Sequence, residues 1–227
     1  MSPIKREASP SERQPKTTAF VNKTDGLAKA PESERVRCSW AKDELSVVYH
    51  DLEWGVPQHD DRTLFEFVVL EGAQAGLSWS TILNKRENYR AAFDNFNAEK
   101  IAVYGESKIQ ELLSNAGIVR NKLKIASAIQ NAKAFLKIQD EFNSFNTYIW
   151  QFADKNSTEV RRRTMTSIPA STAESDAMSK DLLKRGFKFV GTTICYAFMQ
   201  ATGMVNDHDF KCFRYKEIEG QRLEARG

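Results

Sequence analysis

The sequence predicts an all-α fold, and three observations support this prediction. Apolar residues recur at helical spacing in one early segment, as Leu64, Phe65, Val68 and Val69. A second apolar stripe with the same spacing runs along residues 121–138. No segment of the sequence shows the alternating pattern of a half-buried strand, and no internal repeat is present.

Helix-capping residues and apolar spacing place the elements in order. The pair Asp60-Asp61 begins the first long helix, and Ser78 or Ser80 begins the next. Ser175 begins a later helix, which Gly186 ends. The remaining helices are predicted over residues 98–104, 108–115, 121–138, 145–152, 192–201 and 206–212.

The composition indicates an intracellular globular protein. Of its 227 residues 41% are hydrophobic, and no apolar run is long enough to cross a bilayer. The first residues lack the apolar core of a secretory signal, and three cysteines are too few for a disulfide framework. We therefore expect no membrane partner, an intracellular location and thiols that are free to bind metal or to pack in the core.

The net charge of +3 lies at the beginning of the chain. Residues 1–37 carry eight Lys or Arg and five Asp or Glu, which leaves 25 residues of each sign in the remainder. Because four of the six prolines also lie there, we expect residues 1–36 to form a disordered basic tail. The folded domain is predicted over residues 37–215, followed by a frayed C-terminus over 216–227. Any nucleic acid must then be held by a local basic patch of the domain.

The stretch Leu70–Trp79 is the part of the sequence that most strongly suggests a function. Glu71 directly follows the apolar run of residues 65–70. A carboxylate is costly to bury, so a buried one usually has a function. Small residues between Glu71 and Trp79 leave space for a flat group to approach the backbone. The alternative interpretation is a tight turn between two helices, with Trp79 in the core.

Four aromatic residues that can form hydrogen bonds accompany this acid: Trp40, Tyr49, Trp54 and Trp79. Such side chains usually fill a core, but they also stack on flat bases. Combined with one carboxylate they suit a flat ligand that carries positive charge, because the ring faces supply stacking and cation–π attraction.

Two pairs of residues have the chemistry of a metal site. His208 and Cys212 have the spacing of one face of a helix, and Cys38 and His50 lie twelve residues apart near the start of the predicted domain. Together they offer the four ligands of a closed, structural zinc site with no position for an activated water. The alternative is an exposed histidine and unremarkable cysteines. The third cysteine, Cys195, is expected to pack in the core.

Residues 112–125 predict a helical hairpin. Gly117 permits the turn, and a new helix starts beside Arg120, Lys122 and Lys124. Free N–H groups at a helix N-terminus, together with nearby cations, form a seat for an anion such as a DNA phosphate. The alternative is an ordinary helical hairpin with a solvated basic face.

The chain resembles the 3-methyladenine DNA glycosylase I (Tag) family from Arg37 to about Tyr215. The tail lies outside this resemblance, and Ser39 stands where many members carry glycine. The segments that carry the resemblance are Cys38-Ser39-Trp40, Tyr49-His50-Asp51, Glu53–Pro57, Leu70–Trp79, Lys85–Tyr89, Asn115–Arg120, Ile168-Pro169, Arg185–Gly191 and Asn206-Asp207-His208.

The resemblance implies a helix-hairpin-helix DNA glycosylase fold in which a structural zinc ties the N- and C-terminal parts together. It implies the following sites in this sequence: zinc at Cys38, His50, His208 and Cys212; a base pocket of Tyr49, Trp54, Trp79 and catalytic Glu71, with Trp40 close by; a wedge at Gly76-Leu77; and further DNA contacts at Gly117, Arg120, Lys122 and Lys124.

The activity implied by the resemblance is hydrolysis of the N-glycosidic bond of 3-methyladenine, flipped out of alkylated double-stranded DNA. The family lacks the catalytic aspartate that other helix-hairpin-helix glycosylases carry after the hairpin, and no lysine stands out as a nucleophile. We therefore expect a monofunctional enzyme. Because it must wrap around a bent duplex, we expect it to be a monomer. Two other classes fit parts of the pattern: a zinc-containing DNA-binding protein without catalysis, and a binder of a small cationic heterocycle.

Overall fold

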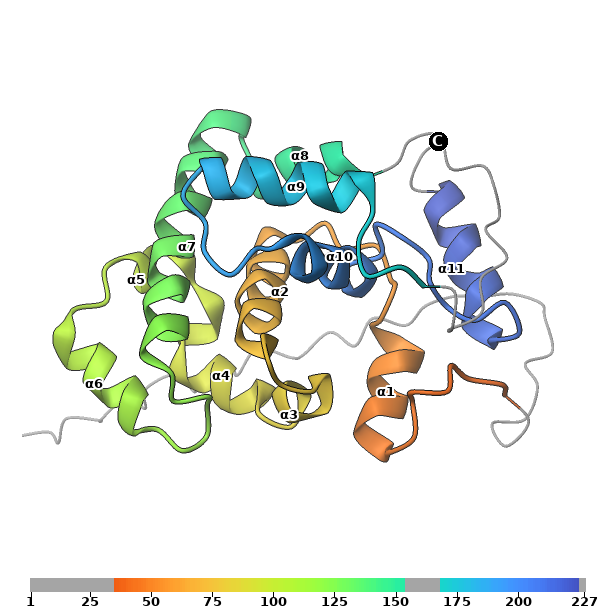
Figure 1. Cartoon of the computed structure of the whole chain (residues 1–227), viewed down its shortest axis with the longest axis horizontal. Helices are drawn as coiled ribbons and strands as arrows, with labels where there is room; N and C mark the ends of the chain where they lie inside the picture. Colours follow the sequence, from red (N-terminus) through yellow and green to blue (C-terminus); the bar gives the residue numbers. More distant parts are fainter. Residues whose placement is uncertain (1–34, 154–167, 225–227) are drawn as a thin grey trace, which may run out of the picture. The chain divides into compact units, whose positions relative to one another are not determined.

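The computed structural model describes residues 35–153 and 168–224, and every regular element in these residues is helical (Figure 1). The all-α prediction is therefore confirmed. The helices are α1 (Glu44–Leu52), α2 (Asp61–Gln74), α3 (Trp79–Leu83), α4 (Arg86–Ala92), η2 (Asp94–Phe96), α5 (Ala98–Ala102), α6 (Glu106–Ser114), α7 (Lys122–Phe142), α8 (Phe145–Ile149), η3 (Trp150–Phe152), α9 (Ala173–Lys184), α10 (Thr192–Ala201) and α11 (Phe213–Glu224).

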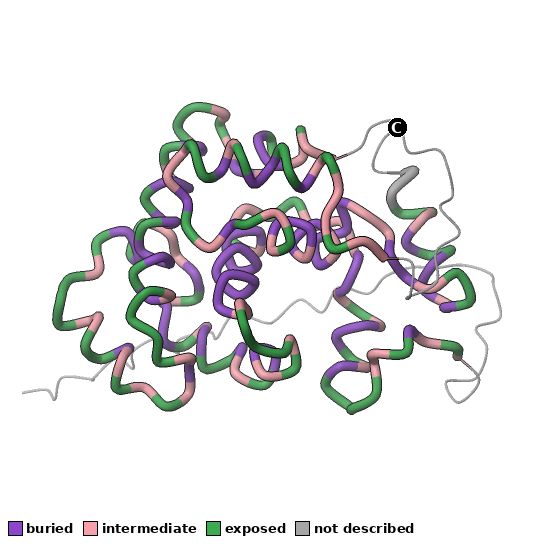
Figure 2. Tube along the Cα trace, in the orientation of Figure 1, coloured by how far each residue is buried: buried purple, intermediate pink, exposed green. Residues whose placement is uncertain are grey.

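Helix α2 lies at the centre of the described fold. It begins as predicted, because the Asp60 side chain accepts a hydrogen bond from Thr63 N at 2.8 Å. Its residues Leu64–Ala73 are all buried, and α7 and α10 pack against it (Figures 1 and 2). A helix that is covered on every side buries its polar residues too, so α2 carries two acids, Glu66 and Glu71, into the interior.

The two buried acids of α2 differ in their partners. Glu66 accepts hydrogen bonds from Arg86 at 2.5 Å and from Arg90 at 3.1 Å, and Arg86 also binds Glu53 at 2.6 Å. This network joins α4 to α2 and to the residue that ends α1. Because both partners of the buried pair are present, the charge of Glu66 is neutralised locally.

The predicted hairpin consists of α6, the loop 115–121 and α7. Asn121 begins α7, since its side chain accepts hydrogen bonds from Leu123 N at 2.9 Å and Lys124 N at 3.1 Å. In the loop, a Cβ on Gly117 would lie 2.9 Å from Asn115 Oδ1 and 3.0 Å from Asn88. The turn therefore requires glycine for its close packing.

The C-terminal part differs from the prediction in two ways. Residues 206–212 form turns instead of a helix, because Asp209 binds Lys211 N with its side chain at 2.9 Å. Beyond them, where a frayed end was expected from residue 216, α11 continues to Glu224 and buries Ile218 completely. The N-cap of α9 is Thr172, three residues before the predicted cap Ser175, and these two residues form a reciprocal capping box.

The N-terminal boundary lies slightly earlier than residue 37. The folded unit begins at Arg35, and Val36 O accepts a hydrogen bond from Phe213 N at 3.0 Å. The predicted tail, up to residue 34, lies outside the described residues. Among the helices of the described ranges, none combines the length and apolar character needed to cross a membrane.

Candidate active site and metal centre

Glu71 lies in the last turn of α2, with 4% of its surface exposed. Its Oε2 atom is buried and has no hydrogen-bond partner among the described residues. Burial raises the pKa of this carboxyl to about 8. Unlike Glu66, Glu71 is therefore a buried acid to which no described residue offers a cation, and such groups mark functional sites.

Two of the predicted aromatic residues lie close together. Helix α1 presents Tyr49 and the first residue of α3 is Trp79, and their ring centroids are 5.4 Å apart. Burial, followed by the charge of Glu71, raises the pKa of Tyr49, so the hydroxyl and the carboxylate share one environment. The Trp79 Nε1 atom is buried and also has no hydrogen-bond partner in the described ranges. Glu71 therefore has an unpaired acceptor and Trp79 an unpaired donor among the described residues, and these two residues lie on either side of the predicted wedge Gly76-Leu77.

Trp40 and Trp54 extend this cluster. Their ring centroids are 5.0 Å apart, and Trp40 also lies 6.3 Å from Tyr49. Trp54 in turn contacts the ring of His208, with 4.5 Å between centroids. The structure therefore brings the four predicted rings into one continuous group, and this group reaches the predicted metal ligands.

The other side of Glu71 faces apolar side chains that the sequence analysis did not assign to a site. They come from α2, α8, α9, α10 and the loop before α10, and with Glu71 they line a small cavity: Val68, Ile149, Met178, Leu182, Val190, Ile194, Cys195 and Phe198. The apolar pattern of residues 192–201 predicted a helix, but nothing in it indicated contact with the acid. This wall offers no charge to Glu71 and explains why its ionised form is disfavoured.

The segment between Glu71 and Trp79 forms an exposed turn. Gly76 has φ +77°, which favours glycine, and the side chain of Leu77 is 41% exposed. Ser78 then begins α3 by accepting a hydrogen bond from Thr81 N at 3.2 Å. The turn thus presents an apolar side chain at the surface, and the assignment of Leu77 as a wedge stays a prediction.

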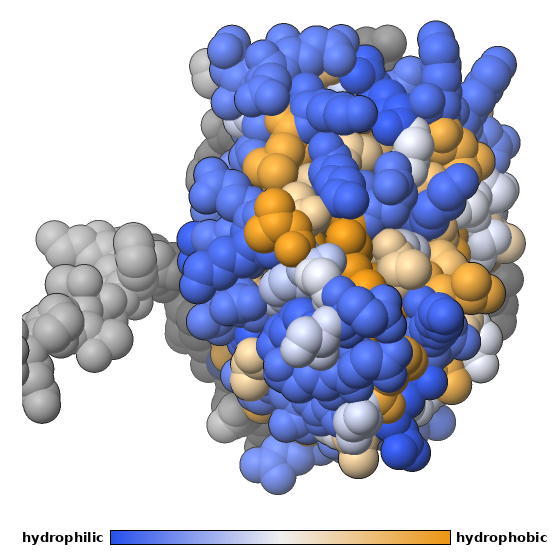
Figure 3. Space-filling model, turned by 90° about the vertical axis from the view of Figure 1, so that its left-hand side faces the viewer, coloured by the Kyte–Doolittle hydropathy of each residue, from blue (hydrophilic) through white to orange (hydrophobic). Residues whose placement is uncertain are grey.

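Of the predicted DNA-contacting cations, Arg120 and Lys122 have exposed side chains at the start of α7. The face of the molecule on which α5, α6 and α7 lie is mostly hydrophilic, with hydrophobic groups between the polar ones (Figure 3). Their exposure leaves both side chains accessible to a DNA phosphate. Their assignment as DNA contacts stays a prediction.

Lys124 differs from the other two cations. Its Nζ atom donates hydrogen bonds to Ala73 O at 2.8 Å and to Ala75 O at 2.7 Å, at the C-terminus of α2. Burial lowers the pKa of this ammonium group. The side chain predicted to contact DNA is therefore partly buried and bound to the end of α2.

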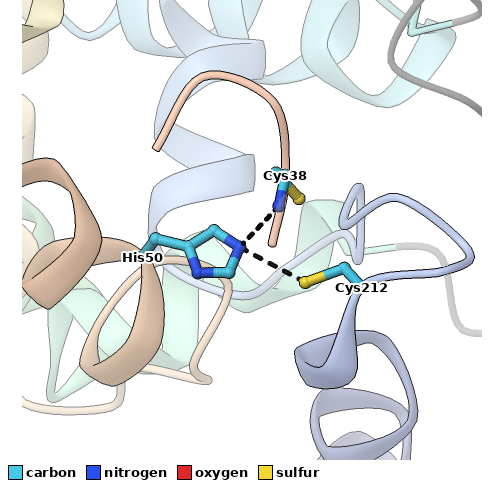
Figure 4. A group of neighbouring side chains, drawn as sticks. All are labelled: Cys38, His50 and Cys212. Atoms are coloured by element: carbon cyan, nitrogen blue, oxygen red, sulfur yellow. Dashed lines mark hydrogen bonds between the residues drawn. The ribbon is translucent and has the colours of Figure 1, made fainter. Parts of the chain in front are cut away.

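Three of the four predicted metal ligands meet in the interior. The ligand atoms of Cys38, His50 and Cys212 all lie within 4.8 Å of one another (Figure 4). The distance between Cys212 Sγ and His50 Nε2 is 3.3 Å. A hydrogen bond from the Cys38 thiol lowers the pKa of Cys212 to about 5 and raises that of Cys38 above its usual range. The group joins the first described segment, α1 and the turn before α11, and its donor set could bind a metal ion.

His208 lies beside this group but outside it. Its ring centroid is 5.1 Å from that of His50, and its Nδ1 atom is 3.1 Å from Asn206 Oδ1. Its Nε2 atom is buried and has no hydrogen-bond partner in the described ranges. An unpaired, buried imidazole nitrogen next to two thiols and a second imidazole fits a tetrahedral metal site. His208 and Cys212 reach this place from turns, and not from one face of a helix as predicted.

The sequence analysis missed the residues that orient His50. Asp51 Oδ1 lies 2.7 Å from His50 Nδ1, and Arg37 binds Asp51 through three contacts of 2.7–3.0 Å. A carboxylate on the second ring nitrogen is the usual support of a metal-binding histidine. The adjacency of His50 and Asp51 in the sequence was the available signal.

Comparisons with known proteins agree with this geometry. Residues 39–215 match the protein family described as methyladenine glycosylase. DNA-3-methyladenine glycosylase 1 of Escherichia coli (strain K12) is 50% identical over 180 residues, which are 79% of this chain and 96% of that protein. DNA-3-methyladenine glycosylase of Haemophilus influenzae is 43% identical over 177 residues, 78% of this chain and 96% of that protein.

Solved structures show the same likeness. A crystal structure of 3-methyladenine DNA glycosylase I aligns with a TM-score of 0.75 at 51% identity, covering 78% of this chain and 98% of the other. A structure of the Staphylococcus aureus protein, described as the structural basis of 3-methyladenine recognition, aligns with a TM-score of 0.74 at 32% identity. It covers 78% of this chain and 95% of the other.

Proposed function

The chain belongs to the 3-methyladenine DNA glycosylase I family, and on this basis we propose that it excises 3-methyladenine from DNA in base excision repair. The observation that carries the proposal is Glu71, a buried acid beside rings that can stack on a base, whose Oε2 atom has no hydrogen-bond partner in the described part of the chain. The substrate is alkylated double-stranded DNA, and the enzyme acts as a monomer.

Glu71 and the aromatic cluster bind the flipped base. Methylation at N3 gives adenine a formal positive charge, so a carboxylate in an apolar site attracts it strongly. The Glu71 carboxylate accepts hydrogen bonds from the base edge, while Tyr49 and Trp79 contact the ring faces. Trp54 and Trp40 close the cluster on the side of the metal group.

The chemistry needs no strong general acid. When the bond between the sugar carbon and the base nitrogen breaks, its electrons neutralise the cationic base, which leaves as a neutral molecule. A water molecule forms the new bond to the sugar carbon and releases a proton. The residues of this chain therefore recognise the cation and hold the nucleotide out of the duplex, and no covalent enzyme–DNA intermediate forms.

Zinc is the metal that suits the group of Cys38, His50 and Cys212, with His208 as the fourth ligand. With these two thiolates and two imidazoles as ligands, the shell would be closed, so the metal would have a structural role. It would tie the start of the domain to its end and hold α1, with Tyr49, in place.

The exposed turn and the hairpin hold the DNA. Leu77 fills the gap left by the extruded nucleotide, and Gly76 lets the backbone approach the duplex. Gly117, Arg120 and Lys122 bind the backbone phosphates, which positions the enzyme without reading sequence.

The test is release of free 3-methyladenine from methylated duplex DNA by the purified protein. Glu71→Ala and Glu71→Gln are expected to lower the excision rate by about 100-fold, because each removes the charge that opposes the cationic base. Glu87→Gln is the control, since the Glu87 side chain is 81% exposed, and it should retain full activity.

A parent protein that binds DNA but releases no base would be a DNA-binding protein without catalysis. Full activity in both Glu71 variants would show that the pocket is assigned wrongly.

A further inference from the structure

The Lys124 ammonium group forms the most direct side-chain link in the described structure between the hairpin and the turn that follows Glu71. It comes from the first turn of α7 and reaches Ala73 O and Ala75 O at 2.8 and 2.7 Å. The carbonyls at a helix C-terminus carry partial negative charge and lack partners within the helix. Lys124 therefore satisfies the end of α2 as a capping cation.

The two carbonyl groups that Lys124 caps lie between two residues of the predicted site. Glu71 precedes Ala73 by two residues, and the exposed Leu77 follows Ala75 by two. The orientation of the Ala73 and Ala75 peptides thus determines where the exposed Leu77 side chain lies relative to the buried Glu71 carboxylate.

A second lysine also reaches the hairpin, from the junction that follows α3. Lys85 lies just after α3, which begins with Trp79, and its Nζ atom donates to Ala116 O at 3.0 Å and to Gly117 O at 3.4 Å in the hairpin loop. The hairpin is therefore bound at two points, by Lys124 to the end of α2 and by Lys85 to the junction of α3 and α4.

We propose that Lys124 is a positioning residue that fixes the turn carrying Leu77 relative to the hairpin, and that it does not bind a DNA phosphate. This inference rests on the proposed function. Phosphates held at the hairpin then place Leu77 at a set position in the duplex, and Glu71 at a set position relative to the extruded base.

The experiment compares three lysines of α7 that differ in surroundings. Lys124→Met removes the capping cation, Lys122→Met removes an exposed predicted phosphate contact, and Lys133→Met, also exposed, is the control. The salt dependence of binding is measured with a duplex that contains an abasic-site analogue. Excision is measured on methylated duplex and on methylated single-stranded DNA.

Lys124→Met is expected to lower kcat on duplex DNA about tenfold, because a misplaced group far from the reacting atoms impairs the productive geometry. Excision from single strands, where no gap needs filling, should stay within twofold of the parent. The slope of log K against log salt should equal that of the parent, whereas in Lys122→Met it should fall by about one. Lys124→Arg, which keeps the charge and the donors, should recover most of the duplex activity.

A lowered salt slope in Lys124→Met, or an unchanged kcat on duplex DNA, would contradict the proposal. If Lys124→Met does not fold, Lys124→Gln is tested in the same way. Hydrogen exchange of residues 73–79 gives a readout that is independent of catalysis: it should rise in Lys124→Met and not in Lys133→Met. Unchanged exchange would overturn the inference, whereas a parent protein without excision activity would overturn the proposed function alone.

Discussion

At the scale of residues, α2 shows why a buried acid must be considered together with its partners. Glu66 and Glu71 lie five residues apart on one buried helix, and the sequence around each is apolar. Glu66 is neutralised by Arg86, which lies twenty residues further along the chain, and Glu71 has no such partner among the described residues. The apolar run predicted that Glu71 is buried. It could not predict which of the two acids is unpaired, because the pairing depends on tertiary contacts.

The unpaired state of Glu71 predicts how catalysis depends on pH. The pKa of the free enzyme's carboxyl is raised to about 8 by burial, so the group is neutral below that value and ionised above it. A cationic base is held by the ionised form. We expect kcat/KM for excision to rise with pH and to level off above about pH 8, since kcat/KM reports the pKa values of the free enzyme.

The control for this pH profile is Glu71→Gln, whose amide does not titrate. Its kcat/KM should be low and nearly independent of pH between 6 and 9 (roughly the range around the raised pKa). A rise with pH that persists in this variant would assign the titration to another group.

At the scale of elements, the sequence predicted the helices that have a clear apolar spacing. It did not predict helices whose formation depends on individual tertiary contacts. The spacing predicted α2, α7 and α10 within a few residues. Helix α11 was missed because its sequence is highly charged and few of its side chains are buried, among them Tyr215 and Ile218. It is held in part by contacts from distant residues, such as Val36 O accepting a hydrogen bond from Phe213 N at 3.0 Å, which the sequence does not reveal.

Helix α11 therefore provides a prediction about stability. Ile218→Ala should lower the free energy of unfolding by about 2–4 kcal/mol, because it empties a completely buried site. Leu183→Ala is the matched control, since Leu183 is 50% exposed, and it should cost less than about 1 kcal/mol. Urea denaturation measures both values. Equal, small effects would mean that the chain after residue 216 is frayed in solution, as the sequence predicted.

At the scale of the whole molecule, the metal group was predictable in composition but not in geometry. Cys38 and His50 lie near the beginning of the folded chain, and Cys212 lies 162 residues after His50. The spacing within each pair, Cys38 with His50 and His208 with Cys212, suggested metal ligands. The fold brings the two pairs together, and in the sequence only the resemblance to the family indicated this. The same limit applies to Lys124: its position beside basic neighbours predicted a DNA contact, and nothing in the sequence indicated the hydrogen bonds that it donates to the end of α2.

The metal group predicts that the two ends of the folded chain depend on each other. Purified protein should contain one zinc per chain by elemental analysis, and Cys212→Ser should contain none, since a structural site loses its closed shell with one thiolate. A zinc site can contribute on the order of 10 kcal/mol to folding. The loss in Cys212→Ser, or on chelation of the parent, should therefore lower the unfolding midpoint by at least about 10 °C.

Cys195→Ala is the matched control, because this buried cysteine lies outside the metal group, and it should keep its zinc. His208→Ala tests the fourth ligand, whose Nε2 atom has no other partner in the described residues. If Cys212→Ser retained zinc, or if the parent contained none, the buried thiols would be core residues and hydrogen bonds alone would join the chain ends. Because Trp54 contacts His208 and Tyr49 directly precedes His50, loss of zinc should also weaken binding of free 3-methyladenine, whereas Ile218→Ala should leave that binding unchanged.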